Sequence, residues 1–337
     1  MKLKLIFLLL ISIFNSQIEA KRTYNLETYF SPMVLKPMAS NMEYVAIAYT
    51  LPAESPHWSV FDLHPKYHFA FSLGFAAHFK NAQTCLKANW QRIHTNDSSS
   101  LSVPSGADMV GPISAIGPDS TEYNSATGNV TFHFDEANLI YGQKIDVSTR
   151  LQTTIFTGIS AIHLAQVVTA TYVDPNGTST RMIQAPQSFN GAGVQFGLEF
   201  EYALNWNVYL LGKGSAAILA GRLHNNTIFN STSPIYTAAP VNEQSITVND
   251  RSQVVPSFNQ RLGFGYQRIF NEHYNICLEA GYQTQIYLNA LQSVNLGSGV
   301  DGLTPAENSV GEFARTFQRA LSNFALAGAF FNISFIF

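Results

Sequence analysis

Apolar residues recur at every second position through long stretches of this chain. The last stretch is the most regular, because each alternate residue from Ala325 to Phe337 is apolar while the positions between them are mixed. A period of two indicates a β-strand with one apolar face. The closing edge strand of a soluble sandwich is the alternative, but repetition of the pattern along the chain favours a barrel with one face in lipid.

Ten segments carry this period, and polar or turn-rich stretches separate them. The segments cover residues 42–51, 67–79, 84–94, 130–145, 151–172, 191–202, 208–222, 257–269, 276–289 and 321–337. The segment at 130–145 changes phase near Asp135, which predicts a one-residue bulge. Because the segments at 42–51 and 151–172 are the least regular, eight or twelve strands remain alternatives to ten.

The connections between these segments alternate in length. Long polar connections follow the odd-numbered segments, and short turns follow the even-numbered ones. The longest connections cover residues 95–129, 224–254 and 292–319. Barrels of bacterial outer membranes have this asymmetry, with long loops outside and short turns in the periplasm. We therefore predict an all-β fold over residues 42–337, a closed antiparallel transmembrane β-barrel of ten strands with extracellular long loops and periplasmic termini.

The start of the chain has the features of a secretory signal peptide, which we assign to residues 1–20. Two lysines precede an apolar stretch over residues 5–14, and Ala20 ends a candidate cleavage site. A retained transmembrane helix is the alternative, but the apolar stretch is shorter than the ~18 residues that a span needs. Residues 21–41, which include two prolines, are predicted to be an N-terminal lead-in.

Composition agrees with a barrel. Charged residues make up 12% of the chain and mean hydropathy is +0.03, so the chain is poor in charge without being a helical membrane protein. A sheet in a bilayer must close, because its backbone groups have no water to pair with. Removing the signal peptide takes away two of 19 Lys+Arg and one of 22 Asp+Glu, which changes the formal net charge from −3 to −4. This charge disfavours nucleic acid as a partner.

Short motifs in the second half of the chain carry a resemblance to a known family. They are Phe189-Asn190-Gly191-Ala192-Gly193, Leu211-Gly212, Ala220-Gly221, Leu262-Gly263-Phe264-Gly265-Tyr266, Ala280-Gly281-Tyr282-Gln283 and Tyr287-Leu288-Asn289-Ala290. In this order and spacing the chain resembles the Legionella-type major outer membrane protein family. The resemblance implies a surface-exposed barrel with pore-forming activity and, in some members, host contact. The long loops match the family poorly, so host contact stays open.

Charges of both signs fall on the predicted inner face of the barrel. They are Lys87, Lys144, Lys213, Arg261, Glu136, Glu199, Glu201 and Glu279. A polar lumen of this kind predicts porin-like passive diffusion of small polar solutes or ions. The opposite interpretation is that these charges pair across the lumen and plug it, since small barrels fill with their own side chains. The chain would then be a surface-exposed structural barrel, or an adhesin acting through its long extracellular loops.

Glycines also fall on the predicted inner face. They are Gly74, Gly142, Gly191, Gly193, Gly197, Gly263, Gly265 and Gly281. Glycine there either widens a narrow bore or permits tight curvature of the sheet. Both interpretations remain open from the sequence.

We expect neither enzymatic activity nor a cofactor. The chain has no GxSxG and no HExxH motif, and its histidines do not recur with aspartate at a fixed spacing. Cys85 and Cys277 are too few for a disulfide framework, and two isolated thiols do not form a metal site.

The expected partners follow from the barrel interpretation. Outer-membrane lipid would cover the apolar face, and the barrel assembly machinery would bind the C-terminal strand. The assembly residues that we predict are Phe331, Ile333, Phe335 and Phe337. A homo-oligomer and a host-surface contact stay open.

Overall fold

The computed structural model describes nine stretches of the chain. They are residues 24–49, 57–79, 82–103, 107–110, 123–177, 180–232, 242–271, 274–298 and 314–337. The predicted signal peptide lies outside the described residues, as do parts of each long connection. Within the described stretches, no helix is long and apolar enough to cross a membrane.

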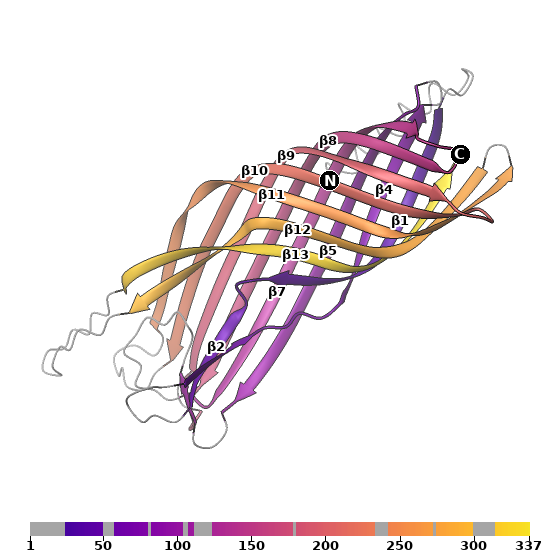
Figure 1. Cartoon of the computed structure of the whole chain (residues 1–337). Helices are drawn as coiled ribbons and strands as arrows, with labels where there is room; N and C mark the ends of the chain where they lie inside the picture. Colours follow the sequence, from indigo (N-terminus) through magenta and orange to yellow (C-terminus); the bar gives the residue numbers. More distant parts are fainter. Residues whose placement is uncertain are drawn as a thin grey trace, which may run out of the picture.

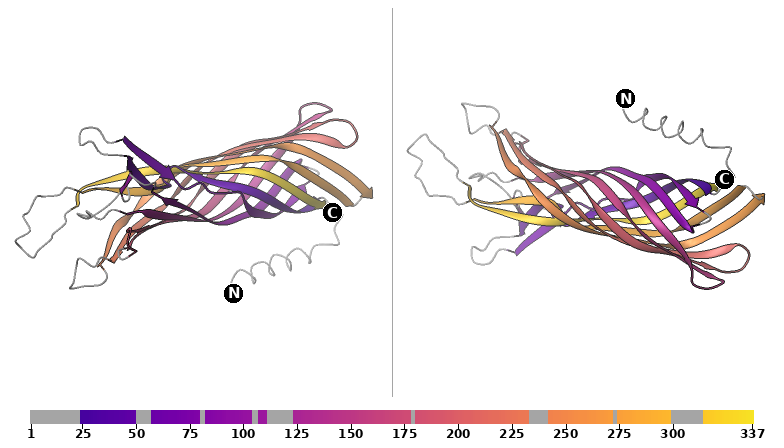
Figure 2. Two further views of the ribbon diagram at one scale, coloured as in Figure 1. Left: turned by 90° about the horizontal axis from the view of Figure 1, so that it is seen from below. Right: turned by 90° about the horizontal axis from the view of Figure 1, so that it is seen from above.

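Ten strands form a closed antiparallel barrel (Figure 1). They are β1 (Tyr24–Ala39), β4 (His68–Phe79), β5 (Thr84–Ser102), β7 (Ser125–Asp146), β8 (Leu151–Val173), β9 (Thr180–Ala203), β10 (Val208–Thr232), β11 (Asn242–Asn271), β12 (Tyr274–Ser298) and β13 (Ala314–Ile336). Around the ring the order is β1-β13-β12-β11-β10-β9-β8-β7-β5-β4. Figure 2 shows the strands running obliquely around one elongated tube. The predicted all-β class is confirmed.

Three short strands lie outside the ring. They are β2 (Glu43–Tyr49), β3 (His57–Asp62) and β6 (Ala107–Val110), which form a separate sheet in the order β3-β2-β6. This sheet lies at the end of the barrel away from Phe337 (Figure 1). The prediction that residues 42–51 form the first barrel strand is therefore wrong.

The first barrel strand is β1, which falls in the segment predicted to be a lead-in. It pairs with β4 on one side and β13 on the other, so the N-terminal strand closes the ring. At one end, Leu26 and Phe337 exchange two backbone hydrogen bonds of 2.8 Å. Pro32 and Pro37 concealed this strand, because proline is normally confined to sheet edges and bulges. The barrel domain accordingly begins before residue 42.

The long connections are shorter than predicted, because the strands continue into them. β5 and β7 stay paired without a break from Thr84–Gln143 to Ser102–Ser125. β10 and β12 also extend into the predicted loops, with register shifts after Leu223 on β10 and after Tyr287 and Gly297 on β12. Residues 95–129, 224–254 and 292–319 therefore include strand ends rather than loop alone. The sequence did not reveal these ends, because both faces of the sheet are polar there. The unbroken pairing of β7 also contradicts the predicted bulge near Asp135.

The outer face of the barrel carries an apolar band. On β9 its outward residues run from Ala192 to Tyr202, a rise of roughly 33 Å along the strand. At a tilt of ~45° this gives a height of roughly 23 Å, close to the ~25 Å of outer-membrane barrels. On the closing strand, Phe331, Phe335 and Phe337 are 40%, 50% and 39% exposed and belong to the same band. Ile333 lies between them on the outer face and is half-buried.

On several neighbouring strands the band ends at register-paired positions. One line of register-paired residues, which we call the polar line, marks this limit: Arg92, Asp135, His163, Asn190 and Arg222, from β5, β7, β8, β9 and β10. Arg92 and Asp135 form an ion pair of 3.7 Å, and His163 shares a hydrogen bond with Asn190. The outer face thus changes from apolar to polar at paired positions on five successive strands.

Candidate functional site

The lumen contains a polar chamber of about 710 Å³. It lies toward the end with the termini and the short turns, since Phe79, Gln83 and Phe337 are among its lining residues. All eight charged residues that we predicted for the inner face line this chamber: Lys87, Lys144, Lys213, Arg261, Glu136, Glu199, Glu201 and Glu279. Six strands of the ring, β5, β7, β9, β10, β11 and β12, position them, because alternate residues of each strand point inward.

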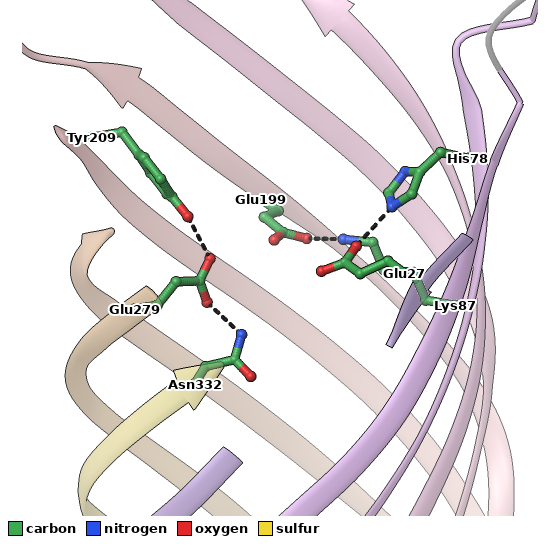
Figure 3. A network of polar contacts seen from close by, with 7 residues as sticks. All are labelled: Glu27, His78, Lys87, Glu199, Tyr209, Glu279 and Asn332. Atoms are coloured by element: carbon green, nitrogen blue, oxygen red, sulfur yellow. Dashed lines mark hydrogen bonds and ion pairs between the residues drawn. The ribbon is translucent and has the colours of Figure 1, made fainter. Parts of the chain in front are cut away.

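Two networks hold carboxylates in the chamber (Figure 3). The Lys87 ammonium on β5 pairs with Glu199 on β9 at 3.0 Å, and both side chains are about four-fifths buried, at 20% and 23% exposure. Glu279 on β12 accepts hydrogen bonds of 3.0 Å from the Tyr209 hydroxyl and from the Asn332 amide. These contacts bridge different strands and fix the carboxylates in place.

Sequence reasoning missed a further pair in this chamber. His78 Nε2 on β4 lies 2.7 Å from Glu27 Oε2 on β1 (Figure 3). Glu27 was missed because residues 21–41 were assigned to a lead-in. The sequence did contain a sign of this strand: Phe30, Val34 and Met38 share one face, and all three are exposed on the outside of β1.

Buried glutamines form the inner limit of the chamber. Gln91 on β5 and Gln285 on β12 donate to each other's side-chain oxygens at 3.0 and 3.1 Å. Gln285 also donates to Glu136 at 3.4 Å. Because β5 and β12 are not neighbours in the ring, this amide pair spans the lumen.

An apolar plug closes the lumen beyond the glutamines. We give this name to Phe132, Phe134, Tyr287 and Phe324, each at most 2% exposed. Their ring centroids lie 5.4 to 6.2 Å apart, the spacing of packed aromatic pairs. The bulge predicted near Asp135 follows Phe132 and Phe134 in the chain, and it would have put them on the same face as Leu139 and Tyr141. Both point inward, because β7 keeps one register along its whole length.

The apolar filling continues toward the long-loop end. Its buried members include Met33, Leu35, Ile93, Leu164, Phe189, Leu219, Val255 and Leu291. The connection between β1 and β4 lies over this end: the hydroxyl of Tyr172 donates to the carbonyl of Tyr44, and a Cβ placed on Gly128 would meet Tyr44 and Leu63. Within the described residues, one end of the lumen is therefore a polar chamber, and the other is largely filled by apolar side chains.

The inner glycines do not widen the bore. A Cβ on Gly193, Gly263 or Gly281 would lie 1.8, 2.3 or 2.1 Å from a backbone carbonyl oxygen of the next strand. These glycines permit close approach of strands, as sheet curvature requires. Elsewhere a tyrosine ring covers the glycine, as Tyr209 does at Gly265. Substituting leucine for Gly281 would thus disturb the sheet itself and could not test the width of the lumen.

The thiols and histidines make no recognisable catalytic centre among the described residues. Cys85 and Cys277 are free and buried. His68 pairs with Asp97 and His224 with Asp250, each at 2.7 Å, so histidine and aspartate do meet although their spacing gave no sign of it. Across the described stretches, no group of three or more His, Cys, Asp or Glu residues could hold a metal ion.

Comparison with known proteins gives one strong match. A sequence model of the family described as the Legionella pneumophila major outer membrane protein precursor matches residues 21–337. No curated protein matches the chain.

Solved structures give weaker likenesses. The outer membrane protease OmpT from Escherichia coli is 11% identical, covers 96% of this chain and 99% of its own, and has a TM-score of 0.43. A Pseudomonas aeruginosa FadL homologue is 7% identical, with 94% and 90% covered and a TM-score of 0.26. At these values neither structure carries a functional argument.

Proposed function

Because the chain belongs to the Legionella pneumophila major outer membrane protein family, we propose that it acts as an outer-membrane barrel with a gated lumen. Small polar solutes or ions enter the chamber by passive diffusion and pass when the apolar plug moves aside. One observation supports this proposal: the lumen holds a chamber of about 710 Å³ that is lined by charges of both signs. A barrel with a purely structural role has no need of such a chamber.

The proposed orientation places the short turns and both termini in the periplasm and the long hairpins outside. The asymmetry of the connections supports it, since outer-membrane barrels carry their short turns on the periplasmic side. The apolar band would lie in lipid, with the polar line at its outer limit. We further propose that Phe331, Ile333, Phe335 and Phe337 are read by the assembly machinery before they enter lipid.

A second candidate function is a closed structural barrel or adhesin that acts through its long-loop end. The completeness of the plug favours it, because the plug residues are at most 2% exposed. In this case the small sheet of β2, β3 and β6 would belong to the surface presented outside, and a homo-oligomer or a host surface would be its partner.

Conductance of the refolded protein in a planar bilayer separates the two functions. The gated lumen predicts brief steps between long closed intervals, with step size rising in proportion to salt. Complete silence from a barrel whose gel mobility is heat-modifiable would favour the structural role. Steady, fully open conductance would contradict the plug.

A further inference from the structure

Two cations face each other at the inner end of the chamber. Lys213 on β10 and Arg261 on β11 are direct register partners, and both line the chamber. Like charges directly opposite each other on one face of a sheet destabilise it. The pairing is therefore costly unless an anion lies between or above the two side chains.

Neither cation has a carboxylate partner among the described residues. No Asp or Glu oxygen lies within 4.0 Å of either side chain. Lys213 lies over the Phe156 ring, 5.2 Å from its centroid, and Arg261 stacks on Phe330 at 4.3 Å. Arg261 also donates to Gln283 at 2.7 Å. Both charged groups are half-buried and remain open to the chamber.

The nearby carboxylates are engaged elsewhere. Glu199, the register partner of Lys213, accepts from Lys87 at 3.0 Å. Glu279 is held by Tyr209 and Asn332 (Figure 3), and Glu136 accepts from Gln285 and Ser160. Within the described residues, none of these carboxylates is therefore at ion-pair distance from Lys213 or Arg261.

We propose that Lys213 and Arg261 form a binding site for a small oxyanion of the phosphate class. Arg261 presents a planar fork of donors and Lys213 a compact ammonium, and together they match the oxygens of a tetrahedral anion. Phe156 and Phe330 each cover one side of a cation, and both cations line the chamber, so the anion would reach them from the chamber. Its path enters past Gln267 and Ile269, which line the short-turn rim.

This site deepens the proposed function by naming a solute class that the chamber holds, but binding does not require passage. A barrel that binds phosphate yet never conducts would contradict only the gated lumen. A barrel that conducts without binding phosphate would contradict only the anion site.

The test is isothermal titration of the refolded, detergent-solubilised barrel with inorganic phosphate, at an ionic strength held constant with chloride. Wild type should bind one phosphate per chain. Lys213→Gln and Arg261→Gln should each weaken binding by at least about tenfold, as loss of one charge-assisted hydrogen bond predicts. Lys36→Gln, which removes an equal charge from the outer face of β1, should bind as wild type does.

Heat-modifiable gel mobility establishes that each variant is folded, and the two site variants test the same site independently. Absence of phosphate binding by wild type would overturn the proposal. Wild-type affinity in either folded site variant would overturn it as well.

Discussion

The rings of Phe134 on β7 and Phe324 on β13 lie 5.7 Å apart, although these strands are not neighbours in the ring. The contact therefore crosses the lumen. Tyr287 touches both rings, at 5.4 and 6.2 Å. A solute leaving the chamber meets this contact directly beyond the Gln91–Gln285 pair, which makes the aromatic contact an obstacle to passage.

Thinning the plug should open the lumen. Phe134→Ala combined with Phe324→Ala should raise the fraction of time spent conducting in planar bilayers, because two rings that fill the bore are removed. Each substitution should also lower the free energy of unfolding by about 3–5 kcal/mol. Phe331→Ala, which removes a ring from the lipid-facing side of β13, should leave conductance unchanged. A folded double variant as silent as wild type would argue for the structural role.

Removing Lys87 and removing Glu199 from the ion pair in the chamber should lower the stability of the barrel by different amounts. Lys87→Met and Glu199→Gln should each destabilise the barrel by about 3–5 kcal/mol, the usual cost of breaking a buried pair. Glu199→Gln should cost more, because it removes the partner of Lys87 and also the carboxylate that lies opposite Lys213 in register. Urea unfolding in lipid vesicles measures both costs. An equal or smaller loss for Glu199→Gln would contradict a role for this carboxylate beyond the Lys87 pair.

Arginine scanning should locate the membrane. Ala216 is the register partner of Phe196, in the middle of the apolar band. Ala216→Arg should make folding into vesicles less favourable by about 2–4 kcal/mol. Ser188→Arg, just beyond the polar line on β9, should cost only about 0–1 kcal/mol. Similar costs at both positions would mean that the band is not the lipid-facing zone.

Removing β1 should prevent the barrel from closing. Deletion of residues 24–39 leaves β4 and β13 with unpaired edges, so the folded, heat-modifiable form should be lost. Deletion of residues 57–62 removes β3 from the small sheet and should leave that form intact. A closed barrel without β1 would show that the predicted lead-in was dispensable after all.

What the sequence could predict depended on how different the two faces of each strand are. β9 was predicted correctly from residue 191 to 202, because outward Val194 and Phe196 alternate with small or charged inward residues. At Phe132 and Phe134 the inner face is as apolar as the outer one. Alternation of apolar and polar residues then no longer tells which face of the strand points inward. The two phenylalanines were therefore assigned to the wrong face, and the plug was not predicted.

The charged chamber was accessible to sequence reasoning for the same reason. Lys87, Glu199 and Arg261 interrupt apolar strands at inward positions, and their phase alone places them in the lumen. Their partners were not accessible, because Lys87 and Glu199 are far apart in the chain and meet only through ring closure. The sequence likewise could not show that Lys213 and Arg261 lie opposite each other, because that depends on the register between β10 and β11.

The two hydrogen bonds between Leu26 and Phe337 make closure of the ring a late step in assembly of the barrel. The seam joins β1 to the end of β13, so the ring cannot be completed until its first and last strands meet. Contacts of such high sequence separation form slowly. Until then β1 and β13 each expose an edge that is open to aggregation and proteolysis, so the incomplete barrel is the stage most vulnerable to both.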